Sequence, residues 1–399
     1  MIKIRRMENA MEIVNGMIFT DEQSFREGTV EIEDGKFKDI IWGHTAKVSE
    51  SSDVIDANGK YVIPGLIDIH FHGCAGYDFC DGTQESLQHI AAYELKKGVT
   101  SICPASMTLS EEMLTGIVAN AASFRDSMAA SPEKQMIYST LRGINLEGPF
   151  LSYAKRGAQN PEYLSRPDAS MLRRLQKKAD GLVKLVSIAP EVEGAMECIK
   201  KCHDEFQFSI AHTEADYETA VKAIEAGAGH VTHLFNAMPP FLHRAPGVIG
   251  AAFDHEETDV EEICDGIHIT PTVIRATFKL FGDKRVILIS DSMMATGMAD
   301  GQYALGGQPV TVRGHLATLT SDGTIAGSAT DLFDCMVNVI HMGIAPESAV
   351  RAATYNPARS IGILDSVGTI TKGKAGDCLI VSSDWRLRKV IHAGIDCGK

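Results

Sequence analysis

Eight strand-like segments alternate with helix-like segments between about residue 62 and about residue 360, and this alternation limits the possible folds most strongly. The strand-like segments are LIDIHFH, VTSICPAS, LRGINLEGP, VKLVSIAPE, FSIAHTEA, HVTHLFNAM, VEEICDGIH and RVILISDS. Their apolar runs are typical of parallel strands covered by helices. Eight strand–helix units in series predict an α/β fold, a (β/α)8 TIM-type barrel. An open doubly wound sheet is the alternative, but HFHGCAGYDFCDG after the first strand does not match its GxGxxG loop.

The two chain ends show short strand and turn patterns instead. MEIVNGMIF and GTVEIEDGKFKDII stand near the start, and VGTITKGKAGDCLIV stands near the end. We expect residues 1–61 and 363–399 to form one small β-sandwich domain beside a catalytic barrel of residues 62–362. Residues 302–326 predict a hairpin inserted in the eighth strand–helix connection.

Composition restricts the partners. The chain has 399 residues and a formal net charge of −14, which disfavours nucleic acid and anionic membranes but allows a small anionic substrate. The nine cysteines form no CxxC pair, which indicates reduced thiols. The start of the chain has no signal-like apolar stretch, and no apolar run approaches membrane-spanning length. We therefore expect a cytoplasmic protein.

Residues able to bind a metal or move a proton end most of the predicted strands. They are His70, His72, Glu147, His212, His233, His268 and Asp291. Strand ends of this kind meet at one mouth of a barrel, where active sites lie. His70 and His72 are two residues apart, so they share a face, with Asp68 one step deeper. One histidine at a strand end is more often structural than a ligand, but the joint pattern predicts a site for Zn²⁺ or Fe²⁺.

Several motifs together resemble the N-acetylglucosamine-6-phosphate deacetylase branch of the amidohydrolase superfamily. They are PGLIDIHFHG, NLEGPFLS, AHTEAD, THLFNAMPP, RAPGVIGAAFD, DGIHITP and ISDSMMATG, and they span essentially the whole chain. The HxH motif is shared across the superfamily, whereas LEGPF and HLFNAM are more specific to the deacetylase branch. The resemblance implies hydrolysis of the N-acetyl amide of N-acetylglucosamine 6-phosphate, giving glucosamine 6-phosphate and acetate.

The resemblance also implies a set of metal ligands and a catalytic acid/base. Glu147, His212 and His233 match the principal metal ligands. His70 and His72 match a pair that holds a second metal, with Glu147 as the bridge. One or two divalent ions per subunit are therefore implied, with Zn²⁺, Fe²⁺ and Mn²⁺ all compatible. Asp291 matches the aspartate that serves as general base and acid for metal-activated water.

Further positions match those that contact the sugar phosphate. They are Ala158, Gln159, Asn236, Ala237, Arg244, Asp265, His268, Ile325, Ala326 and Gly327. In the family, the residue matching Arg244 reaches into the neighbouring subunit's site, which implies a homodimer. One departure concerns Gln159, which stands where some members have a substrate-contacting histidine; its amide donates hydrogen bonds but carries no charge.

Other functions stay open at this point. One is deacetylation of N-acetylgalactosamine 6-phosphate, which differs at one hydroxyl. Others are a cyclic amidase such as a dihydroorotase, or an isoaspartyl-type peptidase. Those relatives often bridge two metals with a carboxylated lysine on strand four, where this chain has VKLVSIAPE with an apolar end. A non-enzymatic binding protein on the same scaffold would have lost Asp291 or a ligand, and none is lost.

Overall fold

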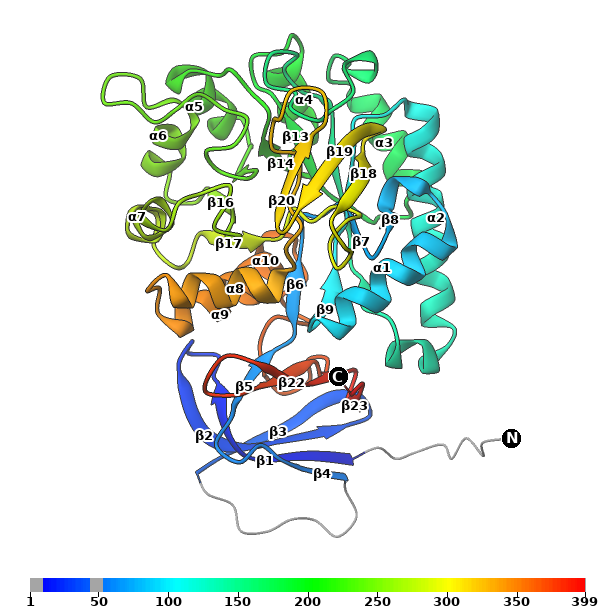
Figure 1. The fold of residues 1–399 in the computed structure, drawn as a ribbon, viewed down its shortest axis with the longest axis vertical. Helices are drawn as coiled ribbons and strands as arrows, with labels where there is room; N and C mark the ends of the chain where they lie inside the picture. The colour runs from blue at the N-terminus through cyan, green and yellow to red at the C-terminus, as the bar shows by residue number, and fades with distance from the viewer. Residues whose placement is uncertain (1–9, 44–52, 399) are drawn as a thin grey trace.

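The computed structural model describes residues 10–43 and 53–398, which form a barrel and a smaller sheet built from both chain ends (Figure 1). The sheet lies below the barrel in Figure 1, and β5 (Tyr61–Pro64) leads from one to the other. Gly65 follows β5 at the crossing. A Cβ there would lie 2.1 Å from Thr100 Oγ1, so only glycine lets the two segments approach this closely.

Parallel strands follow one another around the barrel in chain order. They are β6 (Leu66–Asp68), β9 (Val99–Ile102) with β10 (Ala105–Ser106), β11 (Thr140–Leu141) with β12 (Ile144–Phe150), β13 (Val183–Ile188), β14 (Gln207–Ile210), β15 (His230–Val231), β16 (Asp259–Ile263) and β17 (Val286–Ile289). The ring closes past β17, where Asp291 N donates to His70 O at 2.9 Å and His72 N donates to Ser292 O at 2.7 Å. The predicted TIM-type barrel is confirmed.

The apolar strands divide their side chains between two cores. On β17, Ile287 and Ile289 join the cluster inside the barrel, whereas Val286 and Leu288 join the cluster under the helices. This alternation follows from the two-residue period of a strand. Both faces are therefore buried, which explains the nearly continuous apolar runs of the sequence.

Helices cover the outside of the barrel. They are α1 (Gln84–Lys96), α2 (Glu111–Ala129), α3 (Ala169–Lys178), α4 (Ala195–Cys202), α5 (Tyr217–Glu225), α6 (Gly247–Asp254), α7 (Pro271–Phe281), α8 (Leu332–His341), α9 (Pro346–Ala353) and α10 (Tyr355–Ser360). Several begin at a side-chain cap, such as Thr83 before α1 and Asp331 before α8. Among the described residues, the helices are all too short or too polar to cross a membrane.

The chain ends build one eight-stranded sheet. Its strands are β1 (Ala10–Phe19), β2 (Phe25–Glu33), β3 (Lys36–Trp42), β4 (Asp53–Asp56), β5, β21 (Cys378–Val381), β22 (Leu387–His392) and β23 (Ile395–Asp396). The sequence predicted a sandwich of this origin. The strands are hydrogen-bonded as one continuous sheet. The sheet curls around one apolar core, and Phe37 N donates to Lys374 O at 2.9 Å across it. The limits at 61/62 and 362/363 stay predictions.

A smaller antiparallel sheet interrupts the last connection of the barrel. It consists of β18 (Gly301–Leu305), β19 (Gln308–Arg313) and β20 (Leu316–Leu319), and it lies between β17 and α8. The inserted hairpin predicted for residues 302–326 is therefore present, with one strand more than a simple hairpin. Its apolar face packs on Met107 and Met293, beside the barrel mouth.

Asn356 supplies a test of how α10 holds the start of β17. Its buried Nδ2 donates to Asp283 O and to Val286 O, both at 2.7 Å. Asn356→Ala leaves these carbonyls unpaired, so we expect a loss of about 1–3 kcal/mol in unfolding free energy. Urea denaturation measures this loss. Thr320→Ala, at an exposed position just after β20, is the control, and an equal shift in both variants would contradict the assignment.

Candidate metal centre

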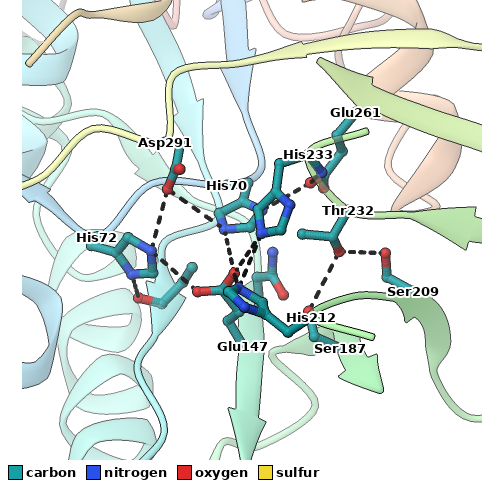
Figure 2. Close-up of polar contacts among 12 residues, drawn as sticks. His70, His72, Glu147, Ser187, Ser209, His212, Thr232, His233, Glu261 and Asp291 are labelled. Carbon is teal, nitrogen blue, oxygen red and sulfur yellow. Dashed lines mark hydrogen bonds and ion pairs between the residues drawn. The ribbon is translucent and has the colours of Figure 1, made fainter. Parts of the chain in front are cut away.

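Five histidine and glutamate side chains meet at the mouth of the barrel, with an aspartate beside them (Figure 2). His70 and His72 follow β6, Glu147 lies within β12, and His212, His233 and Asp291 follow β14, β15 and β17. All six residues are buried, with at most 7% of their surface exposed. The sequence predicted this convergence, and the geometry confirms that the residues lie together.

Glu147 lies at the centre of the group. Its Oε1 is 3.1 Å from His212 Nε2, 3.2 Å from His233 Nε2 and 3.4 Å from His70 Nε2. Its Oε2 is 3.3 Å from His72 Nε2. The ligand atoms form two overlapping groups that share Glu147, namely His70 with His72 and His212 with His233. This arrangement has the form of two adjacent cation sites bridged by one carboxylate.

In three of the imidazoles, the contact made by Nδ1 (the outer nitrogen) determines whether Nε2 (the inner nitrogen) has a lone pair available for Glu147. His72 Nδ1 lies 3.2 Å from Ala105 O, and His212 Nδ1 lies 2.8 Å from Lys155 O. His70 Nδ1 lies 2.8 Å from the Glu261 carboxylate. These oxygens only accept, so each Nδ1 carries a hydrogen, and each ring in its neutral form turns a lone pair toward Glu147. Lone pairs that face a carboxylate need a positive charge between them, which fits a divalent cation.

The site attracts protons for the same reason. Burial alone would lower the pKa of His72, but Asp291 and Glu147 raise it to about 10. Burial alone would raise the pKa of Glu147, yet the surrounding imidazoles hold it well below its usual range. Protons and a metal therefore compete for the same inner nitrogens, as expected of a metal site.

Three of the converging residues have backbone angles that side chains other than glycine rarely adopt. The φ angles are +43° at His212, +29° at His233 and +48° at Asp291. Such left-handed residues cost about 1–3 kcal/mol each and cluster at functional sites. Each of these residues follows the end of its strand by two positions.

A cavity of about 410 Å³ opens onto the metal-ligand group. Most of the predicted substrate contacts line it: Ala158, Gln159, Asn236, Ala237, His268, Ile325, Ala326 and Gly327. The β18–β20 insertion contributes Leu305 and the segment from Thr324 to Gly327 to its wall. The structure thus places residues from distant parts of the chain around one space.

Two of the predicted substrate contacts, Asp265 and Arg244, do not line this cavity. The Asp265 carboxylate accepts hydrogen bonds from the backbone of Ile267 and His268, and it lies 2.7 Å from His268 Nδ1. Burial opposes the charged form, but this contact raises the pKa of His268. Asp265 therefore favours the charged form of an imidazole that lines the cavity. Arg244 lies on an exposed loop outside the residues that line this cavity.

Gln159 lies closer to the ligand group than the sequence suggested. Its Nε2 donates to Glu147 Oε2 at 2.7 Å, and its Oε1 accepts from Thr108 N at 2.7 Å. Because Nε2 already donates to Glu147, the predicted contact between Gln159 and substrate stays a prediction.

Glu261 is the supporting residue that sequence reasoning missed. Its carboxylate contacts His70 Nδ1, accepts from His233 N at 3.2 Å and lies 3.1 Å from His230 Nε2. Although burial would raise it, His70 and His230 lower the pKa of Glu261 to about 2. The signal was the acidic pair in VEEIC, since charge within an apolar strand requires a buried partner.

Comparison with known proteins agrees with this geometry. The amidohydrolase family matches residues 61–395. The N-acetylglucosamine-6-phosphate deacetylase of Bacillus subtilis is 37% identical over 97% of both chains. The N-acetylgalactosamine-6-phosphate deacetylase of Escherichia coli O157:H7 is 28% identical, over 84% of this chain and 88% of the other.

A solved structure shows the same fold over nearly the full length. It is a mutant N-acetyl-D-glucosamine-6-phosphate deacetylase from Mycobacterium smegmatis in complex with N-acetyl-D-glucosamine-6-phosphate. It is 30% identical, with a TM-score of 0.89 over 98% of this chain and 100% of that chain. The chain belongs to the amidohydrolase family.

Proposed function

We propose that this protein hydrolyses the N-acetyl amide of N-acetylglucosamine 6-phosphate to glucosamine 6-phosphate and acetate. The observation that carries metal-dependent hydrolysis is the set of imidazole Nε2 atoms turned toward the Glu147 carboxylate beside a cavity. The similarity to deacetylases of phosphorylated amino sugars supports the substrate. The glucosamine epimer is favoured because its relatives are the more similar.

The donor set fits one or two divalent ions. Glu147, His212 and His233 would hold one ion, and His70, His72 and Glu147 would hold the second. A bound ion would supply Lewis-acid chemistry, polarising the amide and lowering the pKa of water. Imidazole and carboxylate ligands suit Zn²⁺, Fe²⁺ and Mn²⁺ alike.

Asp291 is the group that moves protons in this proposal. Its Oδ1 lies 3.4 Å from His72 Nε2, and its carboxylate lines the cavity. Burial would raise the pKa of Asp291, but the neighbouring His72 and His70 lower it. It is therefore ionised at neutral pH and able to take a proton from the attacking water. The same proton is then delivered to the departing amine nitrogen.

Groups farther along the cavity would hold the sugar phosphate. His268 gains cationic character from Asp265. Asn236 also lines the cavity, but its Nδ2 donates to the backbone oxygens of His233 and Leu234, so its predicted contact with substrate stays a prediction. A homodimer would add Arg244 of the neighbouring chain, whose planar guanidinium suits phosphate. The exposure of Arg244, Leu242 and Phe241 on one loop supports such a contact. Location in the cytoplasm stays a prediction.

Acetate release from both 6-phosphate epimers tests the proposed function. After chelation we expect activity to fall to background, and stoichiometric Zn²⁺, Fe²⁺ or Mn²⁺ should restore it because the ion supplies the electrophile. N-acetylglucosamine 6-phosphate should be the better substrate by kcat/KM. Full activity in metal-free protein, or release only from other amides, would refute the proposal.

Asp291→Asn tests the proton-transfer role. We expect turnover to fall by about 10²–10⁴-fold, because an amide cannot accept the proton from water. The metal content should stay near that of the wild type, since the Glu147 group is unchanged. Acetate release and elemental analysis measure the two effects. Near-normal turnover would reject Asp291 as the base.

Arg244→Ala tests the shared site. We expect a higher KM for the phosphorylated sugar with a smaller change in kcat, because the guanidinium binds phosphate in ground and transition states alike. Mixing Arg244→Ala with Asp291→Asn protein gives the sharper result. Random reassociation of a dimer should restore roughly a quarter of the wild-type sites, each with an intact Asp291 and a neighbour's Arg244. Activity that stays at the sum of the two variants would contradict the shared site.

A further inference from the structure

Gln159 is held in one orientation by its surroundings. Thr108 N–H donates to Oε1 at 2.7 Å, which leaves Nε2 as the end that faces Glu147. The backbone of the loop is fixed as well, because Gln159 N donates to Arg156 O at 2.9 Å and Gln308 Nε2 donates to Ala158 O at 2.5 Å. Only 2% of the Gln159 surface is exposed. The amide is therefore a preorganised donor.

Gln159 donates its hydrogen bond to Glu147 Oε2, the carboxylate oxygen nearest to His72. Glu147 Oε1 faces His212, His233 and His70, the last at 3.4 Å, whereas Oε2 faces His72 at 3.3 Å and accepts from Gln159 at 2.7 Å. The last torsion of a glutamate is broad, so a carboxylate rotates easily when nothing holds it. A donor on Oε2 restrains that rotation and keeps Oε2 directed at His72 while Oε1 faces the other three histidines.

We propose that Gln159 is a positioning residue that keeps the Glu147 carboxylate in its bridging orientation and so secures a second cation at His70 and His72. This inference rests on the proposed function, because it assigns Gln159 a role in the same centre. A neutral amide suits the task. A carboxylate in its place would face Glu147 with a like charge, whereas glutamine donates at every pH at which the protein is folded.

Metal titration of chelated protein tests the proposal. With Mn²⁺ as the probe, we expect the wild type to bind two ions per chain. Gln159→Ala should keep the ion at Glu147, His212 and His233 but bind the second about 10–100-fold more weakly, as is typical when a ligand loses its outer hydrogen bond. Calorimetry and elemental analysis after dialysis report stoichiometry and affinity without any use of activity.

Asn160→Ala is the matched control, since it removes an amide from the same loop without touching Glu147. It should bind both ions as the wild type does. Gln159→His, which keeps a donor, should recover part of the second-site affinity. Thermal unfolding of the metal-free variants verifies that each is folded.

Two results would overturn the proposal. One is Gln159→Ala that binds both ions within twofold of the wild type, and the other is a wild type that binds a single ion. Either result leaves the proposed deacetylase standing if wild-type protein releases acetate. Failure of wild-type protein to release acetate would refute the proposed function, while the titration would still decide the role of Gln159.

Discussion

The arrangement at the barrel mouth depends on electrostatic repulsion among buried groups that only a positive charge can offset. Imidazole nitrogens and two carboxylates are buried within a few ångströms of one another, where their charges are screened less than in bulk water. At an effective dielectric constant of about 20, two unit charges 4 Å apart interact by about 4 kcal/mol. That energy is comparable to a large part of the stability of a domain. Protons or metal ions must therefore occupy the centre, and the donor set favours metal.

The scaffold resists rearrangement of this centre. Barrel closure joins His70 O to Asp291 N at 2.9 Å, so the first and last ligand-bearing strand ends are tied together by backbone. Carbonyl oxygens of Ala105 and Lys155 orient two imidazoles, and Glu261 orients a third. The left-handed backbone at His212, His233 and Asp291 persists because these contacts determine each residue from several sides.

The sequence predicts the barrel and the convergence of the candidate ligands because both follow from simple periodicities. Strand period and helix spacing determine the order of the elements, and the rule that parallel strands end at one mouth brings Glu147, His212 and His233 together. Contacts made through backbone carbonyls and buried carboxylates follow from tertiary geometry instead. The role of Glu261, the anchoring of Gln159 by Thr108 and the continuous curl of the end sheet therefore required the structure.

The metal-ligand group and a phosphorylated sugar would make opposite electrostatic demands on the cavity. Glu147 and Asp291 line the cavity, and a chain with a formal net charge of −14 would repel a phosphorylated sugar overall. Binding of such a substrate therefore needs local positive charge. Burial opposes the charged form of His268, which lines the cavity, but Asp265 and Asp291 raise its pKa. A guanidinium contributed by a second subunit would add further positive charge. The carboxylates that make the centre attract a cation thus also favour the charged form of a cavity-lining imidazole.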